Sequence, residues 1–188
     1  GLRWCDIDMD GDGTVDVSHT LIYYKSTEDG KMKFQINPPK SLSGKRTITM
    51  LGFVKDAFER QRLYQEENKI KCNVIVDGYT DFIFLNRYGN NQHQGTLNKA
   101  LRTIIRDANY DALERNDGTV LIPKISCHNL RATFCTRLAE AGVSLKVAMK
   151  LMGHGDSRTT MEVYTTVCKD WEERELKPVN ELLNINFG

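Results

Sequence analysis

The spacing of apolar residues changes at Gly52, and this change constrains the fold more than any other feature of the sequence. Residues 14–24 (TVDVSHTLIYY) are rich in β-branched and aromatic side chains that alternate loosely, which is typical of a strand. After Gly52 the apolar residues recur at helical spacing: Phe53, Val54, Ala57, Phe58 and Leu63. The sequence therefore predicts strands in the N-terminal part of the chain, before Gly52, and helices after it.

Two further short strands are predicted at residues 33–36 and 46–50. They flank the sequence NPPKSLSGK, whose prolines cannot donate ladder hydrogen bonds and whose serine and glycine residues suit a turn. This pattern predicts a β-hairpin with Lys40 in its loop. The expected fold class is α+β, mostly helical, with a small three-stranded antiparallel sheet near the N-terminus.

Caps and glycines divide the rest of the chain into helices. Thr96 is expected to cap a helix over residues 97–108, followed by a loop or hairpin over 111–124. Ser126 or His128 opens a helix that ends at Gly142. The helices expected after it are one from Ser144 to Gly153, one that begins at Asp156 or Ser157 and passes Tyr164, and a charged one over 169–184.

Composition places the chain among ordinary globular proteins. Its 188 residues are 40% hydrophobic and 27% charged, and the formal net charge is +1. No apolar run approaches the roughly 18 residues of a membrane span, and the N-terminus lacks a signal-peptide pattern. The five cysteines are scattered without a C-x-x-C pair, which indicates neither a disulfide framework nor a zinc site. We expect a soluble, cytoplasmic protein without a membrane segment.

Charge is segregated along this nearly neutral chain. Residues 124–158 contain six Lys or Arg and two acids, whereas residues 1–16 contain five aspartates and one arginine. A polyanion would be attracted to the first stretch and not to the second. A solvated basic helix face is the alternative explanation.

Residues 8–19 (DMDGDGTVDVSH) are similar to an EF-hand calcium loop. The twelfth position, which should carry a bidentate Glu, is His19, and the exit runs into β-rich sequence. We therefore favour an Asp- and Gly-rich hairpin turn and predict no metal site.

The residues that indicate chemistry lie between 126 and 164. His128 and Arg131 are three residues apart at the start of a predicted helix, where free N–H groups favour an anion. His154 follows Gly153 in a turn, and Tyr164 lies on the next helix. Each residue alone has a structural explanation, such as a cap, a turn or the core. Their order and spacing together favour a phosphate-handling site.

Six motifs, which follow one another along the chain in the family's order, resemble those of the tyrosine recombinase (phage integrase) family, and most of all those of the integrases of conjugative transposons. The motifs are HNLRATFCTRLAEAG at 128–142, LMGH at 151–154, TTMEVY at 159–164, LRWCDID at 2–8, PPKSLSGKRTI at 38–48 and FLNRYGN at 84–90. The resemblance implies that residues 1–188 form the catalytic domain, with 169–188 as a C-terminal tail segment. It also places the first catalytic arginine and a core-binding domain upstream of the chain, and Arg3 is not expected to replace that arginine.

The resemblance implies a site-specific recombinase that works through a 3′-phosphotyrosine intermediate to integrate or excise a mobile element. Tyr164 would be the nucleophile, Arg131 and His154 would stabilise the pentavalent phosphate, and His128 would accept a proton or donate a hydrogen bond. Lys40 would protonate the leaving oxygen. No metal and no cofactor is expected.

The expected partners are double-stranded DNA recombination sites and further copies of the chain in a synaptic tetramer on DNA, in a bacterial cell. The candidate DNA-backbone contacts are Arg87, Lys99, Arg102, Arg106, Arg137 and Arg158. Leu182, Leu183 and Phe187 could anchor the tail on a neighbouring copy or on the same chain. A DNA-binding domain without turnover and a calcium-binding interaction module remain alternative hypotheses.

Overall fold

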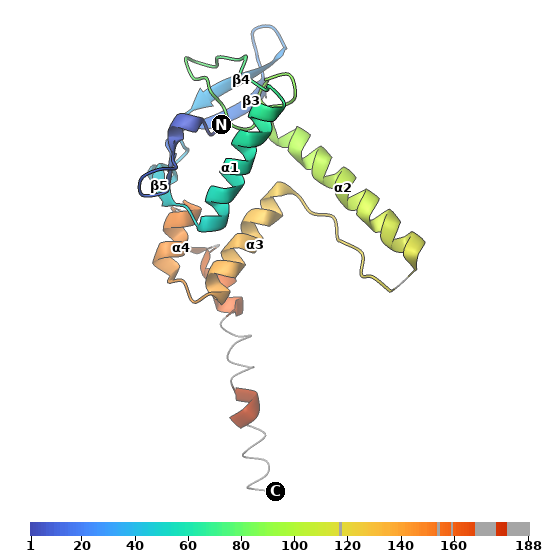
Figure 1. Cartoon of the computed structure of the whole chain (residues 1–188). Coiled ribbons are helices and arrows are strands. Elements are labelled where there is room, and N and C mark those ends of the chain that lie inside the picture. Colours follow the sequence, from blue (N-terminus) through green and yellow to red (C-terminus); the bar gives the residue numbers. More distant parts are fainter. Residues whose placement is uncertain (117, 154, 159, 168–175, 180–188) are drawn as a thin grey trace, which may run out of the picture. The chain divides into compact units, whose positions relative to one another are not determined.

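The computed structural model describes residues 1–116, 118–153, 155–158, 160–167 and 176–179. The chain forms two compact units, Gly1–Cys127 and His128–Gly188. The first unit contains every strand among the described residues, and the second is helical (Figure 1). No helix among the described residues is long and apolar enough to cross a membrane.

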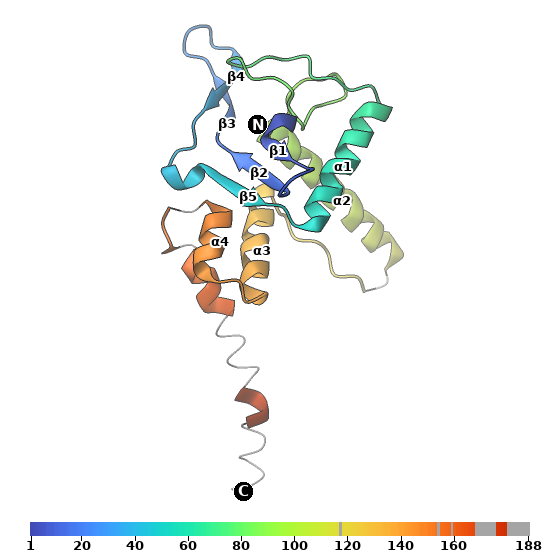
Figure 2. The same ribbon diagram turned by 60° about the vertical axis from the view of Figure 1, so that its left-hand side comes forward.

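Two antiparallel sheets form the N-terminal part of the first unit. The strands β1 (Ile7–Asp8), β2 (Thr14–Val17) and β5 (Arg46–Thr49) make a three-stranded sheet in the order β1-β2-β5. The strands β3 (Thr20–Lys25) and β4 (Met32–Asn37) form a separate hairpin (Figure 2). The predicted α+β fold with a small three-stranded antiparallel sheet is therefore confirmed.

The predicted strand pairing is wrong in two places. Residues 14–24 are two strands in different sheets, separated at Ser18 and His19. The predicted hairpin around Lys40 does not form, because β4 pairs with β3 and β5 pairs with β2. The turn at Ser26–Gly30, where Ser26 N donates to Lys31 O at 2.8 Å, joins β3 directly to β4 and makes these two consecutive strands a hairpin. Lys40 therefore lies in a connection between two sheets.

The Asp-rich segment forms the predicted hairpin turn, between β1 and β2. The Asp8 carboxylate accepts hydrogen bonds from the backbone N–H groups of Gly11 (2.8 Å) and Asp12 (3.2 Å). Gly13 adopts a φ of 63°, in the left-handed region that favours glycine. The Asp8 side chain thus stabilises the turn itself.

The first helix, α1 (Gly52–Glu67), exists as predicted, but the face that it buries differs. Phe53 and Leu63 are 65% and 56% exposed, whereas Gln65 is only 8% exposed. Gln65 Oε1 accepts from Trp4 Nε1 at 3.1 Å, and its Nε2 donates to Ile83 O at 2.7 Å. The prediction was wrong because a half-buried indole N–H and a buried carbonyl take a polar partner on this helix.

The core of the first unit lies where the β3–β4 hairpin meets residues 70–85. Val76, Phe82 and Leu85 are buried, and Leu21 and Phe34 pack against them. The apolar run predicted at 82–85 therefore supplies the core, and Ile83 is fully buried.

The second helix of this unit, α2 (Gln94–Arg115), is longer than the predicted 97–108. His93 caps it in place of Thr96, because His93 Nδ1 accepts from Gly95 N at 3.1 Å. Its C-cap is Asn116, which adopts a left-handed φ of 50°. Residues 111–115, expected in a loop, are therefore helical.

The second unit contains α3 (Cys127–Glu140, which begins in the last residue of the first unit), α4 (Leu145–Met152) and a helical segment over 160–167. Gly142 and Gly153 adopt φ values of 70° and 66° just beyond α3 and α4, as predicted for helix ends. Ser144 is the N-cap residue of α4, although its side chain makes no capping hydrogen bond. Of the predicted helix 169–184, only residues 176–179 are described, and they are helical.

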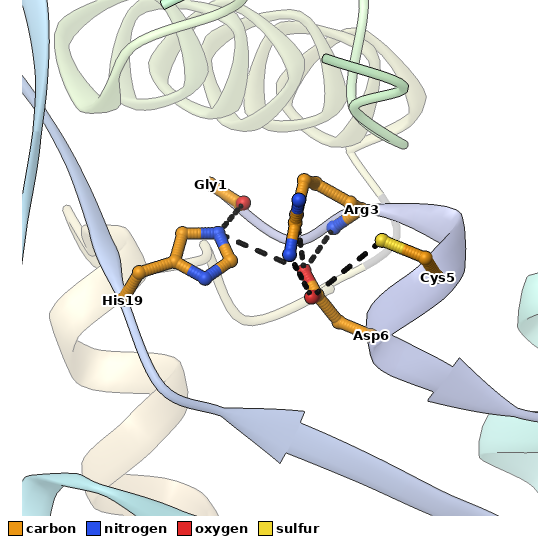
Figure 3. Close-up of polar contacts among 5 residues, drawn as sticks. All are labelled: Gly1, Arg3, Cys5, Asp6 and His19. Carbon is orange, nitrogen blue, oxygen red and sulfur yellow. Dashed lines mark hydrogen bonds and ion pairs between the residues drawn. The ribbon is translucent and has the colours of Figure 1, made fainter. Parts of the chain in front are cut away.

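A buried carboxylate, Asp6, holds the short 3₁₀ turn η1 (Trp4–Asp6) in place (Figure 3). Asp6 is 7% exposed, and both of its oxygens accept from the Arg3 guanidinium, at 2.8 and 3.2 Å. His19 Nε2 lies 3.6 Å from Asp6 Oδ2 and 2.6 Å from Gly1 O. The Arg3 guanidinium also lies over the Tyr79 ring, 4.5 Å from its centroid. Asp6 thus connects η1 to the segment between β2 and β3.

We predict that Asp6→Asn lowers the free energy of unfolding by about 1–3 kcal/mol, because a hydrogen-bonded charge pair is lost from a buried position. The measurement is urea unfolding followed by circular dichroism. Asp107→Asn is the matched control, since Asp107 pairs with Arg106 at a position 58% exposed, and it should cost less than about 1 kcal/mol. Equal effects of the two substitutions would contradict a structural role for Asp6.

Candidate active site

The N-terminal turn of α3 carries His128 and Arg131. His128 is exposed, and Arg131, three residues later, is half-buried. The Arg131 guanidinium donates through Nη2 to the backbone carbonyl of Met152, the last residue of α4. Arg131 therefore links the start of α3 to the end of α4.

Tyr164 is half-buried in the helical segment 160–167. Its hydroxyl donates a hydrogen bond of 2.7 Å to the carbonyl of Val143, in the turn between α3 and α4. Burial raises the pKa of Tyr164, and the nearby Cys135 thiol raises it further. Tyr164 is therefore a neutral phenol whose hydroxyl proton is donated to the Val143 carbonyl.

Cys135 is a neighbour of both residues that the sequence analysis did not identify as part of the site. It lies one turn after Arg131 on α3 and is 3% exposed. Burial raises the pKa of the Cys135 thiol, and the positive charge of Arg131 opposes that shift. The four-residue spacing from Arg131 is the sequence signal that could have indicated it.

The hydroxyl of Tyr164 and the guanidinium of Arg131 contact opposite ends of α4. Val143 precedes the helix by two residues, and Met152 is its last residue. Eight helical residues span about 12 Å at 1.5 Å per residue. The structure therefore brings Arg131, Cys135 and Tyr164 into one small helical unit but holds the phenol away from Arg131.

Two predicted site residues cannot be placed in this arrangement. His154 lies outside the described residues, although Gly153 before it ends α4. Lys40 is exposed, and it belongs to the first unit. The proposed roles of these two residues stay predictions.

The candidate DNA contacts are all exposed basic side chains: Arg87, Lys99, Arg102, Arg106, Arg137 and Arg158. Lys99, Arg102 and Arg106 follow one another at spacings of three and four residues, so they share one face of α2. Arg106 pairs with Asp107 at 2.7 Å and Arg137 with Glu140 at 2.6 Å. Arg87 donates to Tyr88 Oη at 2.5 Å.

The chain matches the model of the phage integrase family over residues 1–170. It belongs to the phage integrase family. The match confirms the resemblance that the motifs indicated. No group of three metal-ligating side chains is found among the described residues.

Transposon transposases and tyrosine recombinases are similar to this integrase-family chain. The transposase from transposon Tn916 of Enterococcus faecalis is 31% identical over 181 residues, which are 96% of this chain and 41% of that protein. A XerC-like tyrosine recombinase of Caldanaerobacter subterraneus is 26% identical over 188 residues, or 97% of this chain and 44% of that protein. The chain thus spans about two-fifths of the length of these relatives.

Solved structures of the family share the fold. The integrase of the Tn1549 transposon, in complex with circular intermediate DNA, is 29% identical with a TM-score of 0.71, over 93% of this chain and 53% of that one. The XerH recombinase bound to its difH substrate is 18% identical with a TM-score of 0.53, over 94% of this chain and 39% of that one, and it supports the fold alone.

We predict that Tyr164→Phe lowers the free energy of unfolding by about 0.5–1.5 kcal/mol, because it removes the hydrogen bond to the Val143 carbonyl. Urea unfolding measures this effect. The matched control is Tyr110→Phe, at a residue 62% exposed, which should leave stability unchanged. Subtracting the ultraviolet titration of Tyr164→Phe from that of the wild type should show ionisation of Tyr164 above the ordinary pKa of about 10.

Proposed function

We propose that this chain is the strand-transferring domain of a site-specific DNA recombinase that integrates or excises a mobile element. Tyr164 attacks a phosphodiester of a double-stranded recombination site, forming a 3′-phosphotyrosine and releasing a 5′-hydroxyl. The observation that carries the proposal is that Arg131 and Tyr164, on different helices, are both half-buried and hydrogen-bonded around α4 in a chain of the phage integrase family.

Arg131 is suited to the non-bridging oxygens of the phosphate. A guanidinium binds two oxygens at once, and at the N-terminal turn of α3 the free backbone N–H groups add to the positive potential. In the substrate complex Arg131 would exchange the Met152 carbonyl for phosphate oxygens. His154 would donate a further hydrogen bond to the pentavalent transition state.

Tyr164 must leave the Val143 carbonyl before it can attack. Its raised pKa makes the free phenolate rare near neutral pH, so a proton acceptor is required. His128 is exposed, three residues before Arg131 on α3, and is the residue that we assign to this transfer, as proton acceptor or phosphate hydrogen-bond donor. Because a neutral imidazole accepts one proton, it can take the phenolic proton as the O–P bond forms.

Lys40 would supply the proton that the departing 5′-oxygen needs. It is exposed on the connection between β4 and β5. The phosphotyrosine conserves the energy of the phosphodiester, so a 5′-hydroxyl of another strand can reseal the DNA without ATP, metal or cofactor.

The exposed basic face of α2, formed by Lys99, Arg102 and Arg106, would contact the DNA backbone, together with Arg87, Arg137 and Arg158. We further propose a synaptic tetramer on DNA, in the bacterial cytoplasm. The structure of the Tn1549 integrase in complex with circular intermediate DNA, which is 29% identical, supports DNA as the partner. Phosphate contacts of this kind should make the affinity fall steeply with salt concentration.

The test of the nucleophile uses a duplex that carries a nick beside the cleavage position, so that a short fragment diffuses away and the covalent product accumulates. We predict a protein–DNA adduct that maps to Tyr164 by mass spectrometry and is absent in Tyr164→Phe. The adduct is scored as a single turnover.

The control is Tyr64→Phe, which keeps the adduct because Tyr64 is 51% exposed on α1, a helix that carries none of the proposed DNA contacts. An adduct that survives Tyr164→Phe would overturn the nucleophile assignment. DNA binding with no adduct in any variant would make the chain a binding domain without turnover.

The test of the general acid replaces the 5′-bridging oxygen with sulfur. A thiolate leaves without protonation, since the pKa of a thiol is about 8.5. We predict that Lys40→Ala slows cleavage of the oxygen substrate at least about 10²-fold and leaves cleavage of the sulfur substrate near the wild-type rate. A defect of equal size on both substrates would show that Lys40 binds DNA and does not act as the acid.

A further inference from the structure

The first unit contains a groove beside the C-terminal end of α1. A cavity of about 650 Å³ is lined by Trp4, Arg62, Lys69, Ile70 and Lys71, among others. A second cavity of about 410 Å³ shares Trp4, Ile70 and Lys71 with the first and continues to Phe82 and Leu85. We call the two together the Trp4 groove. The groove is large enough to hold a ligand bigger than a single small ion.

The charged side chains of the Trp4 groove are mostly cationic. Arg62, Lys69 and Lys71 line the groove, against two acids, Glu66 in the first cavity and Asp81 in the second. None of the three cations forms an ion pair with a described residue; Arg62 instead lies over the Trp4 ring, 4.6 Å from its centroid. The groove therefore presents unpaired positive charge to a ligand, at a place distant in sequence from Arg131 and Tyr164.

Trp4 and Ile70 form an apolar floor in the part of the groove that the two cavities share. The Trp4 indole is fixed by its hydrogen bond to Gln65 Oε1 at 3.1 Å and by an edge contact with Phe58 at 6.5 Å. Ile70 continues the floor towards the buried side chains of Phe82 and Leu85. Because Arg62 covers one face of the indole, this face is not open to stacking by a nucleobase.

Lys69 holds an unusual backbone conformation at the rim. Its φ is 54°, in the left-handed region that a residue with a Cβ atom avoids and that glycine normally fills at a helix end. The helix ends there with hydrogen bonds from Lys69 N to Glu66 O (3.1 Å) and from Ile70 N to Gln65 O (2.8 Å). Lys69 lines the groove in this conformation.

We propose that the Trp4 groove binds an acidic peptide segment of a separate protein partner, with an apolar side chain on the Trp4–Ile70 floor and carboxylates on Arg62, Lys69 and Lys71. A short segment could occupy both cavities, because they share Trp4, Ile70 and Lys71. A duplex DNA backbone would use the cations but leave the apolar floor uncovered, so the peptide accounts for both features of the groove. The proposal does not depend on strand transfer.

The test measures fluorescence anisotropy of a fluorescein-labelled hexapeptide, E-L-E-E-L-E, titrated with the whole chain at low salt. We predict saturable binding that weakens as salt rises, weaker binding of E-G-E-E-G-E because the floor contact is lost, and no binding of K-L-K-K-L-K. Lys69→Glu combined with Lys71→Glu should weaken binding at least about tenfold. The matched control, Lys25→Glu with Lys31→Glu, makes the same charge change at exposed sites outside the groove and should bind as the wild type does.

A second variant keeps the test valid if the double substitution fails to fold. Glycine fits the left-handed conformation at position 69, so Lys69→Gly should fold normally and still weaken binding by removing one ammonium. Equal binding by wild type and Lys69→Gly, or equal loss in the Lys25/Lys31 control, would overturn the proposal.

Displacement of the probe by a short DNA duplex in the wild type but not in the Lys69/Lys71 variant would assign the groove to nucleic acid. Tighter binding of a peptide copying residues 170–176 would assign it to the chain's own tail, and either result also overturns the proposal.

Discussion

A single buried amide, that of Gln65, fixes the arrangement of the first unit. The Gln65 amide accepts a hydrogen bond from the Trp4 indole, 61 positions before it in the sequence, and donates one to the Ile83 carbonyl, 18 positions after it. A leucine would satisfy the apolar pattern of α1 but would leave the Trp4 indole N–H without this partner, and the Ile83 carbonyl with only the longer hydrogen bond of 3.4 Å from Gln61 Nε2. The same amide holds Trp4 in the groove that we assign to an acidic peptide. The proposed recognition at this groove would therefore depend on a hydrogen bond that also ties α1 to Trp4.

In the second unit the proposed catalytic groups are engaged with the backbone and not with each other. Tyr164 donates to Val143, and Arg131 donates to Met152. Net contributions of about 0.5–1.5 kcal/mol for the neutral hydrogen bond of Tyr164 and about 1.5–3 kcal/mol for the one that the charged Arg131 donates are small beside the barrier of a phosphoryl transfer. In the proposed mechanism a bound phosphate, which attracts Arg131 as a charged acceptor, would displace the Met152 carbonyl, whereas no comparable charge would attract the phenol. Movement of Tyr164 would then be the step that substrate binding has to drive by other contacts.

The features that sequence predicted well are those encoded by neighbouring residues. The ends of α3 and α4 follow from Gly142 and Gly153, because a left-handed residue at a helix end is a local requirement. The pairing of β4 was predicted wrongly because it is decided by the turn before it, which the composition of the Lys40 segment does not reveal. At the candidate site, the His128–Arg131 spacing was visible in the sequence. The carbonyl partners of Arg131 and Tyr164 were not visible, since every residue carries a carbonyl and only the fold selects one.

The failure of the predicted hairpin changes how Lys40 can act. In a two-stranded hairpin, a loop lysine moves only by breaking or bending the ladder that holds the loop. Here the strands on either side of Lys40 belong to different sheets, so residues 38–45 carry no ladder hydrogen bonds between them. Pro38 and Pro39 restrict φ before Lys40, and the 3₁₀ turn Leu42–Gly44, held by a hydrogen bond of 2.9 Å from Arg46 Nη1 to Gly44 O, ends the segment. In the proposed mechanism Lys40 would move within a short connection between these two ends, and its motion towards a leaving group would break no hydrogen bond of either sheet.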